Sequence, residues 1–252
     1  MLNDFSLNYG KVNKYIANSW DRIVYTRAQD LINRTDSSYV EIIEPWVVNE
    51  TLENTNEASR VLDIGCGCGY LTNLIYCNGR KNICGIDISK ESIKLAQKTY
   101  HNLTFDCQDI YTARFKNLYD ICLVIMVLNN MPEIKAFFEI LFSTLNIGGK
   151  SVIVLPHPCF WPNKHINNQH YEYMREDSYK IKFATKGRKD YNTFIRYFHR
   201  PIETYLDTII NSGFSINKVV EFVEKDNNIN PDIIGIIISK QAEDNNGNKN
   251  FC

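Results

Sequence analysis

A glycine-rich turn between a short apolar strand and a helix constrains this chain more than any other feature. Residues 61–69 read VLDIGCGCG, so an apolar run ends in an acid and then passes through three alternate glycines. Glycine adopts positive φ in tight turns, and without a Cβ it lets a ligand approach the backbone closely. The N–H groups that open the next helix then face whatever lies in the turn. The pattern predicts an α/β fold with a ligand-binding turn after a strand.

The glycine spacing separates two kinds of cofactor. A dinucleotide-binding turn reads G-x-G-x-x-G, but here Tyr70 stands where its third glycine would be, and Asp63 precedes the first glycine. This D-x-G-x-G-x-G form resembles motif I of the class I (Rossmann-like) S-adenosylmethionine (SAM) methyltransferases. The resemblance covers about residues 58–240.

Three further segments resemble small-molecule members of that family. Residues 126–132 read MVLNNMP, residues 157–160 read HPCF, and residues 198–201 read FHRP. The last departs from the family's YHRP, so a tyrosine hydroxyl at this place would have to come from Tyr197. The resemblance favours a methyltransferase that acts on a small molecule, in biosynthesis.

The resemblance also implies a set of residues that hold SAM. It assigns Asp87, at the end of the second strand, to the two ribose hydroxyls, a role that acids at this place also have in dinucleotide folds. It assigns Asp109 to the adenine amino group, and it gives Asp63 the task of anchoring the glycine turn. The implied cofactor-binding residues are Asp63, Gly65, Cys66, Gly67, Asp87, Ile88, Asp109, Ile110, Ile125 and Met126.

The family fold is a doubly wound sheet of seven strands, mostly parallel, with an antiparallel hairpin at the C-terminus. We expect a single domain over residues 1–240, with a helical N-terminal arm (1–58) and a lid insertion after strand five (156–199). Within the insertion, 179–184 and 191–198 are expected to pair as a hairpin. The polar residues 241–252 are expected to be disordered.

The chemistry implied by the resemblance is an in-line displacement. The sulfonium methyl of SAM would pass to an O, N or C nucleophile of a small molecule, such as a specialised metabolite, and leave S-adenosylhomocysteine. A general base helps only where the nucleophile arrives protonated. The candidate catalytic residues are His157, which follows strand five, and His199, at the end of the insertion. The alternative for each is a hydrogen bond that fixes a loop.

The insertion also collects basic residues. Seven Lys and Arg residues between positions 180 and 200 face Asp190 alone. They could form a solvated hairpin, or a lid that binds a carboxylate or phosphate of an anionic substrate through Arg196 and Arg200. A third substrate candidate is Asn129, for which the alternative is capping of the helix that Pro132 is expected to open.

Composition and charge exclude several classes of partner and site. The net charge of −1 gives no overall field that would attract nucleic acid or an anionic membrane. No apolar run approaches the ~20 residues of a membrane span, and the first ten residues lack a signal pattern. The eight cysteines include no C-x-x-C pair, so we expect reduced thiols and no metal site.

These features favour a cytoplasmic enzyme, monomeric or homodimeric, whose partner is its small-molecule substrate rather than nucleic acid or a membrane. Two alternatives stay open. One is a methyltransferase that acts on tRNA or protein, because aromatic and basic residues together can bind single-stranded RNA. The other is a non-catalytic SAM-binding subunit, because a fold and a binding turn do not prove turnover.

Overall fold

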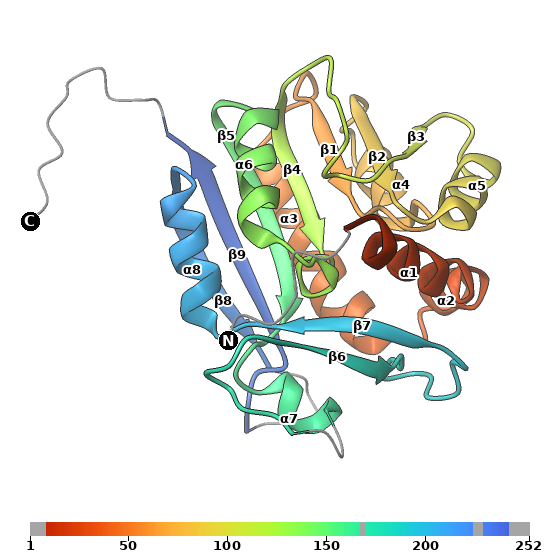
Figure 1. Ribbon diagram of the computed structural model, residues 1–252. Helices are drawn as coiled ribbons and strands as arrows, with labels where there is room; N and C mark the ends of the chain where they lie inside the picture. The colour runs from red at the N-terminus through yellow and green to blue at the C-terminus, as the bar shows by residue number, and fades with distance from the viewer. Residues whose placement is uncertain (1–8, 167–169, 224–228, 242–252) are drawn as a thin grey trace, which may run out of the picture.

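Short apolar runs rich in β-branched residues form a central sheet of seven strands (Figure 1). The computed structural model describes residues 9–166, 170–223 and 229–241. In spatial order the strands run β3-β2-β1-β4-β5-β9-β8. Their bounds are β1 (Val61–Ile64), β2 (Ile83–Asp87), β3 (Thr104–Cys107), β4 (Tyr119–Ile125), β5 (Leu145–Pro156), β8 (Phe214–Phe222) and β9 (Ile233–Lys240).

The strand directions confirm the expected doubly wound sheet. Strands β1 to β5 pair in parallel, whereas β9 lies antiparallel between β5 and β8. In an open α/β sheet, ligands bind outside the carboxyl ends of the strands. The edge of the sheet where β1, β2, β3, β4 and β5 end is therefore the place to look for the site.

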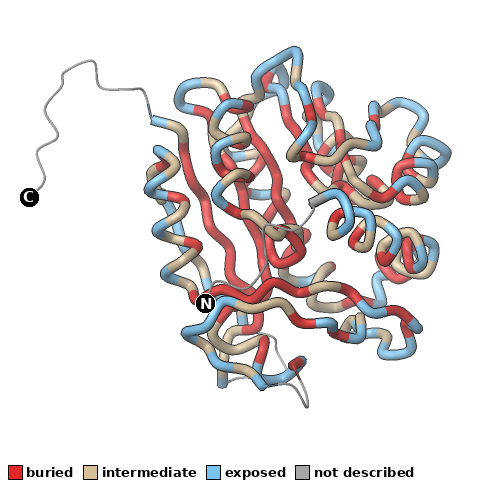
Figure 2. The backbone as a smooth tube through the Cα atoms, viewed as in Figure 1, coloured by how far each residue is buried: buried red, intermediate tan, exposed pale blue. Residues whose placement is uncertain are grey.

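Helices cover both faces of the sheet, which explains why its inner strands are apolar on both sides. Side chains of α6 and α8 pack with Leu62 and Ile64 on one face, and those of α3 and α4 pack with Val61 on the other. Figure 2 shows the buried strands between these layers. The bounds are α3 (Glu44–Glu53), α4 (Tyr70–Cys77), α5 (Lys90–Thr99), α6 (Ile134–Thr144) and α8 (Ile202–Asn211).

Two further groups of elements lie at the carboxyl end of the sheet (Figure 1). The N-terminal arm contains α1 (Tyr9–Asp21), α2 (Val24–Ile32) and the short π-helix η1 (Tyr39–Ile43) ahead of α3. The insertion after β5 contains the short helix α7 (Trp161–His165) and an antiparallel two-stranded sheet, β6 (Asp177–Lys182) with β7 (Phe194–His199).

The hairpin forms as expected, but with a longer connection. The last residue pair of its ladder is Lys182 with Phe194, followed by one more backbone hydrogen bond from the Phe183 N–H to the Thr193 carbonyl at 2.9 Å. We call residues 183–193 the lid loop. The expected pairing through Ala184 and Tyr191 is wrong because the lid loop packs against the N-terminal arm instead. A Cβ on Gly187 would lie only 2.0 Å from the carbonyl oxygen of Thr35.

Three other features bear on the expectations. None of the helices in residues 9–166, 170–223 and 229–241 combines the length and apolarity needed to cross a bilayer. The seven cysteines in these ranges are free, and within them no three His, Cys, Asp or Glu side chains are grouped as metal ligands. The predicted disordered tail lies, apart from Gln241, outside the described residues.

Candidate active site

The glycine turn adopts a conformation that requires glycine. Gly65 and Gly67 have φ of +76° and +54°, and the Gly65 N–H donates to the Ile86 carbonyl of β2 at 2.8 Å. A Cβ on Gly65 would lie 2.4 Å from Cγ2 of Val127, whereas a Cβ on Gly67 would meet nothing within 4 Å. Gly65 therefore packs against the chain that follows β4, and Gly67 faces open space.

That space is part of a cavity of about 920 Å³, in the size range of small-molecule sites. Its floor is the carboxyl edge of the sheet, since residues directly at the ends of β1, β2, β3, β4 and β5 line it. The structure brings nine of the ten predicted cofactor residues to its wall, all but Asp63. They are Gly65, Cys66, Gly67, Asp87, Ile88, Asp109, Ile110, Ile125 and Met126.

Asp87 links the glycine turn to the helix after β2. Its carboxylate accepts the Gly67 N–H at 2.9 Å and the Ser89 N–H at 2.7 Å, while the Ser89 hydroxyl caps α5 by accepting the Ser92 N–H. Burial raises the pKa of the Asp87 carboxyl, and the two backbone donors oppose that shift. The carboxylate is held in place and retains lone pairs for ligand hydroxyls.

Asp109 is held in a similar way. Its Oδ2 accepts the side-chain amide of Asn13 in α1 at 2.6 Å, and its Oδ1 accepts the Tyr111 N–H at 3.1 Å. A carboxylate offers about four lone-pair sites, so one further donor can still bind. Ile88 and Ile110, which follow the two acids, both line the cavity. Two fixed acids and two apolar side chains suit a ligand that has hydroxyl and amino donors and a flat ring.

Asp63 lies behind the turn rather than on the cavity wall. It is 2% exposed and accepts the Thr72 hydroxyl of α4 at 2.6 Å, which ties β1 to the helix that follows the turn. Burial raises the pKa of its carboxyl to about 7, although the Thr72 hydrogen bond acts in the opposite direction. Its position fits the expected anchoring of the turn.

The raised pKa of Asp63 predicts a pH-dependent stability. The unfolded chain releases this proton near pH 4 and the folded chain near pH 7. The free energy of unfolding should therefore fall as pH rises through this window, by up to about 4 kcal/mol. Asp63→Asn keeps an acceptor for Thr72 and should remove this loss, as urea unfolding between pH 4 and pH 8 would measure. The exposed Asp190→Asn is the control, and equal pH slopes in both variants would contradict the prediction.

The chain after β4 turns sharply at the cavity wall. Met126 adopts φ of +60°, which is uncommon outside glycine, and its N–H donates to the Val154 carbonyl of β5 at 2.7 Å. Next comes the 3₁₀ helix η2 (Leu128–Asn130), whose Asn129 lines the cavity.

The capping interpretation of Asn129 is wrong. Helix α6 begins only at Ile134, with Glu133 as its N-cap residue and no side-chain cap. Asn129 instead contacts Asn130 at 3.4 Å, and Asn130 donates to the Arg196 carbonyl of β7 at 2.6 Å. The two asparagines connect the end of β4 to the hairpin of the insertion.

His157 does not line the cavity. It is 1% exposed, its Nδ1 accepts the Cys159 N–H at 3.2 Å, and its Nε2 lies 2.7 Å from a Glu221 carboxylate oxygen. Since Nδ1 is the acceptor, Nε2 carries the proton and donates it to Glu221. These contacts favour the alternative that the sequence left open, a ring that fixes the loop after β5, and a catalytic role for His157 stays a prediction.

His199 is also placed away from the described cavity wall. Its Nε2 donates to the Tyr173 carbonyl at 2.8 Å, and burial lowers its pKa. Its ring contacts those of Tyr171 and Tyr197. These contacts favour a structural role, and a catalytic role for His199 stays a prediction. The histidine that does line the cavity is His165, stacked on Trp161 at 4.0 Å between ring centroids.

A substitution separates the structural role of His157 from a catalytic one. We expect His157→Ala to lower the free energy of unfolding by about 1–3 kcal/mol, because the Cys159 N–H loses its acceptor in a buried loop. Methyl transfer by the folded variant should stay within about threefold of the wild type. Denaturant unfolding and a methyl-transfer assay would measure the two effects. A hundredfold loss of turnover without loss of stability would restore the catalytic role.

The two arginines assigned to the substrate also have structural partners. Arg200 is 5% exposed and donates to the carbonyls of Met131 and Pro132 at 2.9 and 2.7 Å. The guanidinium of Arg196 lies 5.7 Å from the ring centroid of Tyr15 in α1 and 3.5 Å from the Ser178 hydroxyl. Neither arginine is among the described residues that line the cavity, and their substrate assignment stays a prediction.

The N-terminal arm forms much of the cavity roof, which residue-by-residue reasoning missed. The lining residues of α1 and α2 recur every three or four positions, as one helical face requires. This spacing indicates that α1 and α2 each have one buried face, but it does not show that the face lies over a cavity. The residues are Asn13, Ile16, Trp20, Val24, Arg27 and Leu31.

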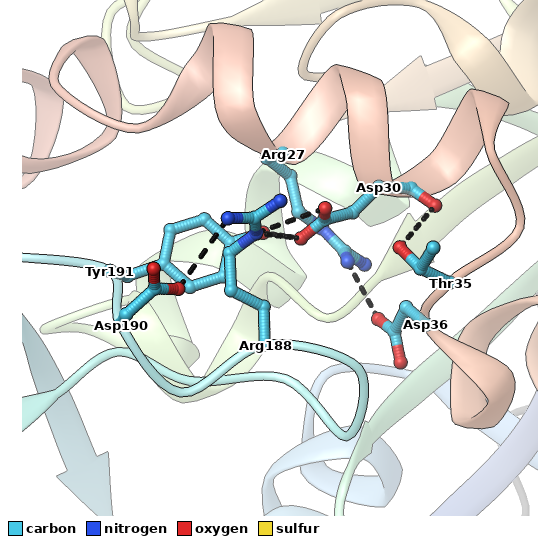
Figure 3. Close-up of polar contacts among 7 residues, drawn as sticks. All are labelled: Arg27, Asp30, Thr35, Asp36, Arg188, Asp190 and Tyr191. Carbon is cyan, nitrogen blue, oxygen red and sulfur yellow. Dashed lines mark hydrogen bonds and ion pairs between the residues drawn. The ribbon is translucent and has the colours of Figure 1, made fainter.

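The lid loop is fastened to this arm (Figure 3). Asp30 of α2, 2% exposed, accepts Nε of Arg188 on both oxygens at 3.1 Å and also accepts the Tyr191 hydroxyl. Beside it, Arg27 pairs with Asp36 at 2.6 Å. Because Gly187 packs directly on Thr35, side chain and backbone contacts together hold the loop over the cavity.

Comparison with known proteins agrees with this geometry. Residues 55–199 match a family model described as a methyltransferase domain. Over 142 residues the chain is 30% identical to a protein of Invertebrate iridescent virus 6, provisionally named methyltransferase 235L. The aligned segment makes up 54% of this chain and 51% of that protein. A malonyl-[acyl-carrier protein] O-methyltransferase of Bacillus cereus is 32% identical over 93 residues, 36% of this chain and 35% of that protein. The chain thus spans about half or less of the length of these relatives.

Solved structures share the fold. The magnesium protoporphyrin IX methyltransferase of Synechocystis PCC 6803 superposes with a TM-score of 0.66 at 16% identity, covering 91% of this chain and all of that one. An S-adenosylmethionine-dependent methyltransferase of Mesorhizobium loti gives a TM-score of 0.63 at 19% identity, covering 77% of this chain and 96% of that one.

Proposed function

Because the chain belongs to the methyltransferase domain family, we propose that it is a SAM-dependent methyltransferase that acts on a small molecule. One observation carries the proposal: the glycine turn, Asp87 and Asp109, which are far apart in sequence, meet on the wall of a single cavity. When bound, SAM supplies a methyl group on a sulfonium, and the product is S-adenosylhomocysteine.

The proposed cofactor contacts follow from the geometry of the wall. The open space at Gly67 suits the methionine part of SAM, which would lie against Gly65, Cys66 and Gly67 with no Cβ of Gly67 in its way. The fixed carboxylate of Asp87 is proposed to accept the ribose hydroxyls. Asp109, oriented by Asn13, is proposed to accept the adenine amino group.

The remaining cofactor contacts are apolar or indirect. Ile88 and Ile110 would pack against the adenine ring, and Ile125 and Met126 would complete the wall at the end of β4. Asp63 is proposed to act through the turn, because its side chain bonds to Thr72 and not to the cavity.

The enclosure of the cavity supports a small-molecule substrate. The N-terminal arm and the lid loop lie over the edge of the sheet, and their apolar and aromatic side chains Ile16, Trp20 and Phe183 line the cavity, where they would limit the access of water to a bound substrate. Exclusion of water and a fixed orientation are what an in-line methyl transfer needs. The name of the Bacillus cereus relative refers to a malonyl group, a carboxylate, and an anionic substrate fits the basic lid of this chain.

Two experiments test the proposal. Isothermal titration should detect binding of S-adenosylhomocysteine to the full chain, and Asp87→Ala should weaken it about a hundredfold or more. Labelled SAM should then be offered with a small-metabolite extract and, separately, with an RNA and protein fraction. Label in a metabolite would support the proposal and identify the acceptor. Label only in the macromolecular fraction would contradict the small-molecule assignment, and absence of binding would contradict the whole proposal.

A further inference from the structure

A buried oxygen without a hydrogen-bond partner lies in the wall of the cavity. Asn129 lines the cavity and is 6% exposed, yet no donor in the described part of the chain reaches its Oδ1. Among the described lining residues, only the Thr185 hydroxyl is buried and unpaired in the same way. A hydroxyl can rotate and can donate or accept, whereas a carboxamide oxygen only accepts. Asn129 therefore makes the more specific demand, which is for a donor.

The orientation of the Asn129 amide follows from its neighbours. The Arg196 carbonyl lies 2.6 Å from one end of the Asn130 amide, and because a carbonyl only accepts, that end is Nδ2. The other end, Oδ1 of Asn130, then faces the Nδ2 donor of Asn129 at 3.4 Å. Turning the Asn129 amide over would place two carboxamide oxygens against each other. Oδ1 of Asn129 is thus the atom left without a partner.

An unpaired acceptor of this kind is costly for a folded chain. A buried oxygen that has lost water without gaining a donor destabilises the fold, and native structures keep few of them. Asn130 is equally buried, at 6% exposed, but both ends of its amide have partners. Because Asn129 lines the cavity, a ligand in the cavity can supply the donor that its oxygen lacks.

Asn129 lies between the proposed cofactor site and the insertion. Two residues before it, Val127 is the side chain against which Gly65 of the glycine turn packs. The next residue, Asn130, donates to β7 of the insertion. Methyl transfer takes place where cofactor and substrate meet. The position therefore suits the group that is methylated rather than the ribose or the adenine, to which two acids are already assigned.

We propose that Oδ1 of Asn129 accepts a hydrogen bond from the nitrogen or oxygen that is methylated. The assignment rests on the proposed function and refines it: the substrate is an amine or a hydroxyl compound, because a carbon nucleophile or a carboxylate offers no such donor. A nucleophile that donates its N–H or O–H to Asn129 directs a lone pair away from it, toward the methyl carbon.

The role of Asn129 in the transfer is to orient the nucleophile. The lone pair of the nitrogen or oxygen forms the new bond to carbon, and the carbon–sulfur electron pair stays on sulfur. The proton that the methylated group then sheds passes to water, because a carboxamide oxygen is too weak a base to keep it.

Two measurements test this acceptor without knowledge of the substrate. The first compares the binding of S-adenosylhomocysteine and of sinefungin to the full chain by isothermal titration. Sinefungin is a SAM analogue in which a carbon that bears an amino group replaces the methylated sulfur. It presents N–H donors where the methyl group would lie, and S-adenosylhomocysteine presents none there. The second measurement is urea unfolding without any ligand.

The variants are Asn129→Leu and its equally buried control, Asn130→Leu. Alanine variants at both positions repeat the comparison in case leucine fits poorly. Asn129→Leu should weaken sinefungin binding by about tenfold or more, since the amino group loses its acceptor. Binding of S-adenosylhomocysteine should change by less than about threefold.

The unfolding midpoints should separate the two asparagines. Asn129→Leu removes an unpaired acceptor and one long contact of 3.4 Å, so its midpoint should lie within about 0.2 M urea of the wild type or above it. The midpoint of Asn130→Leu should fall by about 0.5 M or more, because the Arg196 carbonyl loses its donor.

The assignment to the methylated group can fail in three ways. A midpoint that falls as far in Asn129→Leu as in Asn130→Leu would make Asn129 a structural residue. Unchanged binding of sinefungin would show that Asn129 does not face the methyl position. Equal losses for both compounds would assign its oxygen to a group that they share, such as their α-ammonium. If the wild type bound neither compound, the proposed function would fail and this inference with it, whereas the other three results overturn the inference alone.

Discussion

Gly65→Ala should both destabilise the protein and abolish binding of S-adenosylhomocysteine. The substitution places a Cβ 2.4 Å from Cγ2 of Val127 and imposes a φ of +76° on a residue with a side chain. Left-handed backbone costs an L-residue about 1–2 kcal/mol, and overpacking costs about 1–3 kcal/mol more. We therefore expect the free energy of unfolding to fall by about 2–5 kcal/mol and the affinity to fall at least about a hundredfold.

Gly79→Ala provides the matched control. Gly79 has φ of +96°, but a Cβ there meets nothing within 4 Å, and the residue lies outside the described cavity wall. This variant should show only the backbone cost and should bind S-adenosylhomocysteine normally. Denaturant unfolding and isothermal titration measure both variants. If Gly65→Ala lost no more stability than Gly79→Ala, the contact with Val127 would not constrain the turn.

Asp30→Ala should release the lid loop from the N-terminal arm. The substitution removes the acceptor of the Arg188 guanidinium and of the Tyr191 hydroxyl at a buried position. Breaking a buried ion pair costs about 3–5 kcal/mol, but Arg188 is 36% exposed and can return to water, so we expect about 2–3 kcal/mol. Amide exchange in residues 183–193 should become at least about tenfold faster. The KM for the substrate should rise more than the Kd for S-adenosylhomocysteine.

Asp190→Ala is the control for this effect. Asp190 also lies near Arg188, at 3.5 Å, but its side chain is 80% exposed. Exposed ion pairs contribute little, so this variant should change stability by less than about 0.5 kcal/mol and leave exchange unaltered. Equal protection of the lid loop in Asp30→Ala and in the wild type would show that Gly187 and its contact with Thr35 suffice to hold it.

The sheet and the cavity wall at its carboxyl edge were predictable because local sequence determines them. Each predicted residue of that wall ends a strand or lies within about three residues after one, so that its place in the fold follows from the position of the strand. Asp87 and Asp109 illustrate this, since each stands at or just after the carboxyl end of an apolar run. The glycine spacing around Gly65 then indicated the kind of ligand.

The contacts that hold the roof of the cavity and the hydrogen-bond partners of its polar residues were not predictable, because these partners are distant in sequence. Asp30 meets Arg188 158 residues later, and His157 meets Glu221 64 residues later. The residues close to His157 in sequence give no sign that a carboxylate lies within hydrogen-bond distance of its Nε2. The same holds for Arg200, whose guanidinium binds backbone carbonyls 68 and 69 residues earlier.

The fastening between Asp30 and the lid loop also has a consequence for protein engineering. A chimaera that takes only residues 156–199 from a homologue would bring a foreign loop against Asp30 and Thr35, where a residue larger than glycine at position 187 has no room. The N-terminal arm and the insertion must therefore be transplanted as a pair. The seven-stranded sheet, with its glycine turn, Asp87 and Asp109, could then be kept constant while different pairs of N-terminal arm and insertion are exchanged over it.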